Sequence, residues 1–589
     1  MIHSYTTLLR IFIFIVLIFY PFIGKGEVNA DTTNYYAEIN TDTVSVVTWN
    51  DSIDMRDSIP CRMAVCDEET ERVTSGVDVV DTLEVDSVKL GDYASLPTSL
   101  SAFRRERYSN AMCQLNDTLV VLKPRPIRAV VENLSINALV LSFDYFVQQR
   151  DYARISRYVL KHNFKTGMVW DQDSFSGNQF SHPFHGSMFF NAARENGLNF
   201  WQSIAFPVVG SLTWEFMCET NEPALNDLLS TGVGGVLLGE VCHRVSDLIL
   251  DETVWGIDRV VREVFGNVVN PVRGVKRLCR GQWWHRGTSR GKEEPVVPVD
   301  IQLGVGNRYL SNKVGFAKGL NVPYVSFDMT YNDRFDDSGH DPFDWFRVKM
   351  LFNFSSKQST VGDLDIRGRL ANVLLHSKNE YWKFDLALYQ LLKYVETYPV
   401  EQDILTGSSI AGADQTRREF NQNVSDYPII SEAVSVGGGA YSEYNYKKLQ
   451  LNNDLIVAAV ILGGQRSDYY PCRTYNFSQG FSVRNDFKTV LFNRLTLGDD
   501  FYYARFFTFG KYDDKELRYR LDNGLRVSTQ GDRGQSTIIV NRLYAITELF
   551  KGINLKVESV LHYRRSNYKY YPSVTGRHFE VNMGLVCKL

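Results

Sequence analysis

Six histidine and glutamate residues in the middle of the chain have the chemistry for acid–base or metal work. These candidates are His182, His185, Glu215, Glu219, Glu240 and His243. Imidazole and carboxylate groups serve as metal ligands and as proton carriers. Glu215 and Glu219 are four residues apart and therefore share one face of a helix. One hypothesis is that all six converge on a single catalytic site; which metal or cofactor it holds is unknown.

A structural role explains the same residues and is the favoured interpretation. The sequence contains none of the diagnostic spacings, such as His-Glu-x-x-His, Gly-x-Ser-x-Gly or a phosphate-cradling loop. Helices that fill a charged barrel lumen would need polar side chains to satisfy its wall. Structural ion networks of this kind imitate functional sites. Asp171 and Asp173 are likewise interpreted as capping a turn and not as binding calcium.

The elements that must position these residues are helices. Apolar residues at helical spacing predict a helix within 131–160, and Pro183 and Gly197 mark the start and end of another. A further helix is expected at about 200–220, bent at Pro207. The last runs from Pro223 to Leu250, and its small residues permit a close approach to the helix bearing the paired glutamates. That stripe consists of Thr231, Gly235 and Gly239.

Several ordered motifs in this region resemble a known family. They are WDxDxF, HPFHG, FNAAREN, GSLTWEF, NDLLSTGVGG and GEVCHR, and the resemblance covers roughly residues 130–285. Together they resemble the bacterial family called "domain of unknown function 3943", which is typical of Bacteroidetes envelope proteins. The resemblance implies a compartment and no reaction. Ala224 stands where the family tends to have serine, which weakens any role for a hydroxyl group there.

From about residue 300 the hydrophobic period changes from helical to two. Val348 and Met350 alternate with Arg347 and Lys349, and similar alternation recurs to the end of the chain, including 517–527. A soluble sandwich also alternates, but runs of ten residues with charges of both signs on the polar face favour an outer-membrane barrel. The prediction is an α+β protein: a helical domain at 106–292, then an antiparallel barrel of about twelve strands at 300–589.

The segments before and between these domains suggest export and membrane contact. Residues 1–30 are typical of a secretory signal peptide. Residues 31–100 carry 4 Lys/Arg against 15 Asp/Glu, a net charge of −11, so 31–105 is interpreted as a largely disordered acidic linker. Residues 256–292 combine basic side chains with tryptophan, which suits either a membrane interface or a solvated connector.

These features predict a protein of the Gram-negative outer membrane. The expected partners are outer-membrane lipid and the outer-membrane assembly machinery, and an exported chain is not expected to bind nucleic acid. One function class is a barrel with a helical plug, serving envelope structure or passage of a small solute. The alternative is a membrane-embedded enzyme that acts on envelope lipid or cell-wall material through the His and Glu residues.

Overall fold

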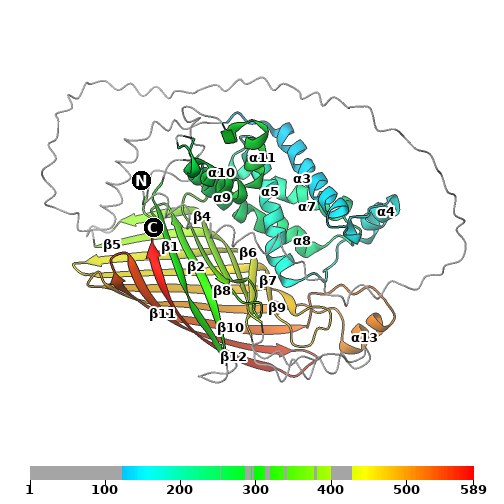
Figure 1. The fold of residues 1–589 in the computed structure, drawn as a ribbon. Helices are drawn as coiled ribbons and strands as arrows, with labels where there is room; N and C mark the ends of the chain where they lie inside the picture. The colour runs from blue at the N-terminus through cyan, green and yellow to red at the C-terminus, as the bar shows by residue number, and fades with distance from the viewer. Residues whose placement is uncertain are drawn as a thin grey trace, which may run out of the picture.

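The computed structural model describes residues 122–252, 254–284, 294, 297–311, 319–336, 341–376, 381–398 and 427–589. The predicted signal peptide, the acidic linker and most of the polar insertion at 398–428 lie outside these residues. The described chain forms a helical domain beside a large β-barrel (Figure 1). This arrangement confirms the predicted α+β class.

The helical domain consists of short helices with turns of 3₁₀ or π type between them. The main helices begin with α3 (Pro126–Phe146), α4 (Arg157–Thr166), α5 (His182–Arg194), α6 (Phe200–Ser203) and α7 (Ala205–Met217). They continue with α8 (Leu225–Leu229), α9 (Gly235–Ile249), α10 (Ile257–Val269) and α11 (Pro271–Cys279). A π-helical turn at Ser230–Gly234 joins α8 to α9. No helix in the described residues is both long and apolar enough to cross a membrane.

Twelve antiparallel strands close into a barrel in which each strand pairs with its sequence neighbours and β1 pairs with β12. The first six are β1 (Val299–Ser311), β2 (Gly319–Tyr331), β3 (Phe346–Asn353), β4 (Val361–His376), β5 (Trp382–Glu396) and β6 (Ile429–Tyr446). The others are β7 (Leu449–Arg466), β8 (Tyr475–Leu491), β9 (Leu495–Thr508), β10 (Gly534–Phe550), β11 (Ile553–Tyr568) and β12 (Val574–Lys588). Closure leaves no unpaired edge, as in outer-membrane barrels. The predicted strand number is confirmed.

One predicted strand is wrong. The alternation noted at 517–527 is not a strand, because its first part forms the helix α13 (Asp514–Asp522) in the connection between β9 and β10. The Asp513 side chain caps this helix by accepting a hydrogen bond from the Glu516 backbone N–H at 2.8 Å. Leu517 and Leu521 are four residues apart, so helical spacing also places them on one face.

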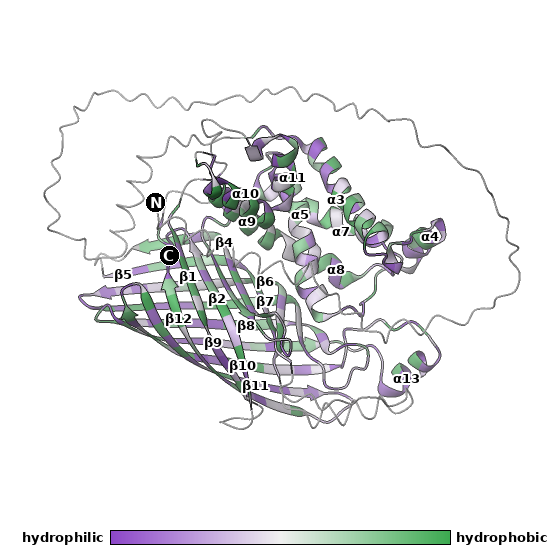
Figure 2. Cartoon of the chain, viewed as in Figure 1, coloured by the Kyte–Doolittle hydropathy of each residue, from purple (hydrophilic) through white to green (hydrophobic). Residues whose placement is uncertain are grey.

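The polar face of the strands points into the lumen, where ion pairs connect opposite walls. Lys349 on β3 contacts Asp500 on β9 at 3.1 Å, and Arg542 on β10 contacts Asp363 on β4 at 2.7 Å. Each of these strand pairs is six positions apart in a ring of twelve. The alternation of hydropathy along the strands is visible in Figure 2. The lumen is therefore bridged by charged side chains.

The apolar face of the strands points outward, and the helical domain covers part of it. One buried cluster joins Phe190 and Val241 of the helices to Met329, Val348 and other strand residues. Gln390 on β5 also donates a hydrogen bond to the Val233 carbonyl oxygen at 2.8 Å. The expectation that the helices fill the barrel is therefore wrong, because they pack on its outer wall. Val348 faces outward as predicted, but protein and not lipid covers it.

Two of the basic side chains in the described part of residues 256–292 point into the helical domain and away from any membrane surface. Arg259 and Arg273 are buried, where they pair with Glu263 at 2.5 Å and with Glu195 at 2.7 Å. The exposed side chains of this stretch include Trp284. Burial of a charged group requires a partner, and the helical domain supplies carboxylates for both arginines.

Candidate functional site

The six predicted residues separate into two groups at opposite ends of α5. His182 and His185 belong to the first turn of α5, whereas Arg194, which binds Glu240, is its last residue. Twelve residues of helix between His182 and Arg194 correspond to about 18 Å. His182 therefore belongs with Glu215, and Glu240 belongs with His243. The six residues do not form one site.

The first group is a carboxylate–histidine cluster formed by His182, Glu215 and Asp227. One ligand atom from each of the three lies within 4.8 Å of the others. His182 Nε2 is 3.3 Å from Asp227 Oδ1, and His182 Nδ1 is 3.4 Å from the Thr231 hydroxyl. The two carboxylates are almost completely buried, and His182 is partly so. We refer to these three residues as the His182 cluster.

Local structure fixes each member of the cluster. His182 lies in the first turn of α5, where Pro183 is pre-shaped for a helix start. Glu215 lies near the end of α7, and its Oε2 accepts a hydrogen bond from the Ala224 backbone N–H at 2.8 Å. Asp227 lies in α8 and accepts a hydrogen bond from the Asn226 side chain at 2.8 Å. The chain reversal between α7 and α8 thus brings the two carboxylates together.

Further acidic side chains surround the cluster, so that several carboxyl groups are crowded together there. Asp171 is linked to Asn178 at 2.8 Å and to Asn226 at 3.0 Å. Burial, and secondly the charge of Asp227, raises the pKa of Asp171. Burial and then Glu219 raise the pKa of Glu215 in the same way. When buried carboxylates are crowded together and positively charged side chains do not balance them, the binding of protons or of a metal cation is favoured.

The donor set of the His182 cluster fits a divalent cation. One imidazole nitrogen with carboxylate oxygens is a ligand combination found around zinc and other first-row metals. Glu219 adds a carboxylate that interacts with the side chain of Glu215. Burial, and secondly the charge of Asp227, raises the pKa of Glu219. A bound cation at His182, Glu215 and Asp227 would offset the mutual repulsion of these acids. It would act as a Lewis acid there.

His185 takes no part in this donor set. Its ring lies 4.5 Å from the Phe189 ring and 5.1 Å from that of Trp214, measured between centroids. Burial, and secondly the neighbouring His182, lowers the pKa of His185 to about 3. A neutral imidazole among aromatic rings is a packing residue in this environment.

The second group, Glu240 and His243, belongs to a paired ion network. Glu240 contacts Arg194 at 2.9 Å and Arg244 at 2.8 Å, and His243 Nδ1 lies 3.3 Å from Glu195. Burial opposes the ionised form of Glu240, but Arg194 and Arg244 together lower its pKa below the ordinary value. Each charge has an opposite partner, so this group fits the structural interpretation.

One member of the His182 cluster, Asp227, and one neighbour of it, Asp171, were not among the predicted site residues. Asp227 supplies a ligand atom, and Asp171 completes the amide network that holds it. The Asn226-Asp227 pair within the NDLLSTGVGG motif was the available signal. Residues of the barrel also hold this region. The Arg473 guanidinium donates a hydrogen bond to the Asp171 carbonyl oxygen at 2.5 Å. The Tyr475 hydroxyl donates one to the Asp173 carbonyl oxygen at 3.1 Å. Contacts this distant in sequence leave no local pattern.

The small-residue stripe makes a close approach, but its partner differs from the prediction. A Cβ at Gly235 would lie 2.5 Å from the Gly186 Cα, and a Cβ at Gly239 would lie 2.8 Å from Phe190. Both neighbours belong to α5, not to α7, which bears Glu215. Gly232, in the π-helical turn and outside the stripe, faces α7, with Val208 at 3.3 Å from an added Cβ. The stripe therefore fixes α9 against α5.

Comparisons with known proteins support the family resemblance. Residues 167–272 match the family model described as a domain of unknown function (DUF3943), which confirms the resemblance over that stretch. No curated protein matches the chain. Among solved structures, the NanC porin is similar over 49% of this chain and 100% of its own, with 10% identity and a TM-score of 0.24. The outer membrane channel DcaP of Acinetobacter baumannii is similar over 50% of this chain and 96% of its own, with 7% identity and a TM-score of 0.21.

An outer membrane channel from Pseudomonas putida F1 gives a similar result. It covers 50% of this chain and 97% of its own, with 10% identity and a TM-score of 0.24. Identities and scores this low carry no function from these proteins to this chain. The fold rests on the strand pairing described above.

Proposed function

We propose that this chain is an outer-membrane protein whose barrel holds the helical domain in the envelope, a structural role. The observation that carries this proposal is the set of ion pairs between opposite walls of the lumen, such as Lys349 with Asp500 and Arg542 with Asp363. Salt bridges that cross a lumen occupy the path that a solute would take. Passage of a small solute would require these pairs to separate.

The strand connections support an orientation for the barrel in the membrane. Two-residue turns at 447–448 and 551–552 lie at the same end as the first strand residue Val299 and the last residue Leu589. The connection that contains α13 lies at the other end. Short turns are typical of the periplasmic side and longer loops of the extracellular side. Arg473 and Tyr475 hold the His182 cluster near the second end, and hence toward the cell exterior.

Conductance in a planar lipid bilayer tests the structural role. We expect the wild-type protein to insert without the steady conductance of an open porin. The double variant Lys349→Ala with Arg542→Ala removes two crossing cations and should conduct more than wild type. A matched control is Lys515→Ala, because Lys515 is exposed on α13 outside the barrel wall. Steady wild-type conductance at the porin level would favour solute passage instead.

A second candidate function is metal-assisted chemistry on envelope lipid or cell-wall material. The specific observation in its favour is the His182 cluster, whose three ligand atoms lie within 4.8 Å of one another. A cation held there could polarise an ester or phosphoryl oxygen of a lipid in the outer leaflet. Glu240 and His243 have no part in this candidate, since their charges are paired elsewhere.

Metal titration separates the two candidates. We expect purified protein to bind Zn²⁺ or Mn²⁺ with one site, and Asp227→Asn to lose most of that affinity. Glu516→Gln provides a control, because Glu516 is a half-exposed acidic residue on α13. Equal binding by wild type and Asp227→Asn would remove the metal-assisted candidate and leave the structural role.

A further inference from the structure

Helix α3 is inverted in polarity relative to a helix on the surface of a soluble protein. Its buried face carries Asn133 and Asn137, whose amide groups donate to the Phe206 and Gly210 carbonyl oxygens of α7 at 2.9 and 3.0 Å. Its outer face carries Leu139 and Phe146, which are 65% and 74% exposed. A water-facing helix has the opposite arrangement, with its apolar stripe inward.

The few hydroxyl groups on the outer surface are satisfied without water. Ser135 donates to the Val131 carbonyl oxygen at 2.8 Å, and Ser142 donates to that of Ala138 at 2.6 Å. These bonds return to the helix's own backbone four residues earlier. The sequence between Asn133 and Phe143 contains no charged residue. Both features are required of polar groups that face hydrocarbon.

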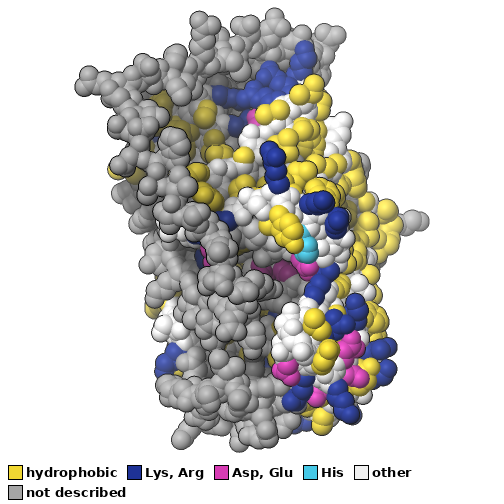
Figure 3. Space-filling view, turned by 90° about the vertical axis from the view of Figure 1, so that its right-hand side faces the viewer, with side chains coloured by type: hydrophobic (Ala, Val, Ile, Leu, Met, Phe, Trp, Pro, Cys, Tyr) yellow, Lys and Arg dark blue, Asp and Glu magenta, His cyan; other side chains and the backbone are white. Residues whose placement is uncertain are grey.

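The same inversion recurs on α10 and α11. Their arginines and glutamates point inward into ion pairs, as described for Arg259 and Arg273. Their outward side chains are apolar: Ile257, Val260, Val275 and Leu278 are all exposed. Figure 3 shows hydrophobic side chains gathered over the helical half of one face of the molecule. The exposed apolar surface thus extends over α3, α10 and α11.

This surface is continuous with the outer wall of the barrel. On β5, Leu386 and Leu388 are exposed, whereas Leu392 and Tyr394 further along the same outward face are buried in the cluster shared with the helices. The helical domain therefore occupies part of the belt around the barrel that lipid would otherwise fill. The face of the helical domain that points away from the barrel is then in contact with the same surroundings as the rest of the outer wall of the barrel.

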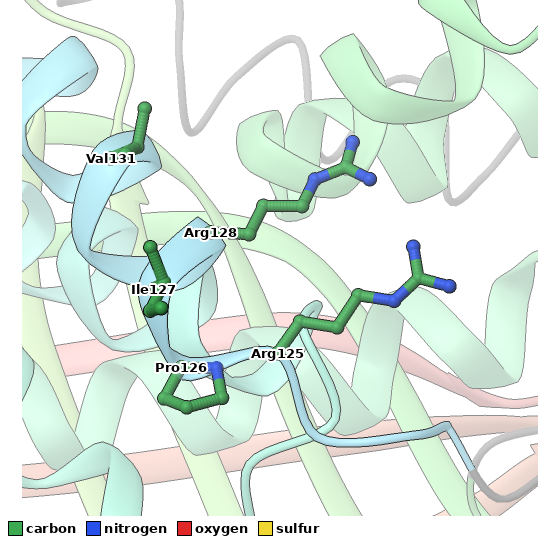
Figure 4. A pocket seen from close by; sticks show the side chains of 5 residues that line it. All are labelled: Arg125, Pro126, Ile127, Arg128 and Val131. Carbon is green, nitrogen blue, oxygen red and sulfur yellow. The ribbon is translucent and has the colours of Figure 1, made fainter. Parts of the chain in front are cut away.

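We propose that the helical domain lies within the membrane beside the barrel, with the outer face of α3 against the acyl chains of lipid. This inference rests on the proposed outer-membrane location and adds that a second, non-barrel domain is a lipid-contacting part of the protein. At the start of α3, Ile127 and Val131 line a shallow, open depression together with Arg125 and Arg128, whose side chains extend to the same side (Figure 4). Arginines next to apolar side chains suit the headgroup boundary of such a contact.

Collision accessibility of a nitroxide in lipid vesicles tests the proposal. A ketone-bearing amino acid with an oxime-linked nitroxide avoids the 8 native cysteines of the full chain. The label replaces Leu139 on α3, Val457 on the outer face of β7, or Lys515 on α13. We expect the ratio of collisions with oxygen to collisions with a water-soluble nickel chelate to be several-fold higher at 139 and 457 than at 515.

The three positions distinguish failure of this inference from failure of the proposed function. A label at 457 that favours oxygen, together with one at 139 that favours nickel, would overturn the inference and leave the barrel in the membrane. A label at 139 that neither reagent reaches would also overturn it, because a protein partner would then cover α3. Labels at 139 and 457 that both favour nickel would contradict the membrane location itself.

Discussion

The contact between α5 and α9 gives the sharpest prediction about the helical domain. Gly186 on α5 faces the π-helical turn so closely that an added Cβ would lie 2.0 Å from the Thr231 carbonyl oxygen. An ordinary contact begins at 3.4 Å, so Gly186→Ala requires the two backbones to separate by 3.4 − 2.0 = 1.4 Å. Both clashing groups lie close to the backbone, so no side chain can rotate away.

The expected cost follows from two opposing effects. Overpacking of this kind costs about 1–3 kcal/mol or more. Alanine in place of glycine in a helix regains about 1 kcal/mol. Because the clash involves backbone atoms, we take the upper end of the overpacking cost, about 3 kcal/mol, and the net loss after the gain from alanine is about 2 kcal/mol. Thr231 contacts His182, so a shift here also disturbs the His182 cluster.

Denaturant unfolding combined with limited proteolysis measures this effect. Gly186→Ala should lower the unfolding midpoint and expose the helical domain to protease while the barrel stays resistant. Gly438→Ala on β6 is the matched control, because an added Cβ there meets nothing within 4 Å. The packing argument is refuted if Gly186→Ala and Gly438→Ala are equally stable.

Three further predictions concern other contacts. Asn137→Leu should lower the free energy of unfolding in detergent by about 1–3 kcal/mol, measured by denaturant unfolding, because the Gly210 carbonyl oxygen loses its buried donor. Tyr475→Phe should loosen the Asp171 region, seen as faster amide exchange there than in wild type, since its hydroxyl bonds both Asn178 and Asp173. Burial raises the pKa of Asp532, in the connection before β10, to about 6. The stabilising contribution of Asp532 is therefore full below about pH 4 and is lost as pH rises through about 6. Asp532→Asn should thus gain stability relative to wild type between pH 4.5 and 7. A difference in unfolding free energy between the two proteins that stays constant over this pH range would contradict the prediction.

The barrel could be predicted from the sequence because its signal is local and repeated. Alternation such as Arg347, Val348 and Lys349 predicts which side chains face the lumen. Twelve or thirteen such runs, together with the even strand number usual for these barrels, predict twelve strands. The error at 517–527 arose because two leucines four residues apart fit both periods over a short stretch. The Asp513 side chain caps the first turn and thereby stabilises the helix over a strand.

The position of the helical domain could not be predicted, because the alternation of apolar and polar residues along a strand is the same whether lipid or protein covers its outward face. Val348 and Val457 both face outward, yet only Val348 is covered. Likewise, the polar residues of α3 face inward only because α7 offers them carbonyl oxygens. For the site, the sequence supplied His182 and Glu215, but the pairing with Asp227 depends on the chain reversal between α7 and α8. The separation of Glu240 and His243 from this cluster follows from the length of α5.

The central claim is that the helical domain packs on the outer wall of the barrel and not in its lumen. A photo-crosslinking amino acid placed at 348 or at 349 tests it directly, since adjacent strand residues face opposite sides of the wall. The structure predicts that position 348 crosslinks to peptides of the helical domain, and that position 349 crosslinks to β8 or β9. Crosslinks from 348 to lipid, together with crosslinks from 349 to the helical domain, would contradict the claim.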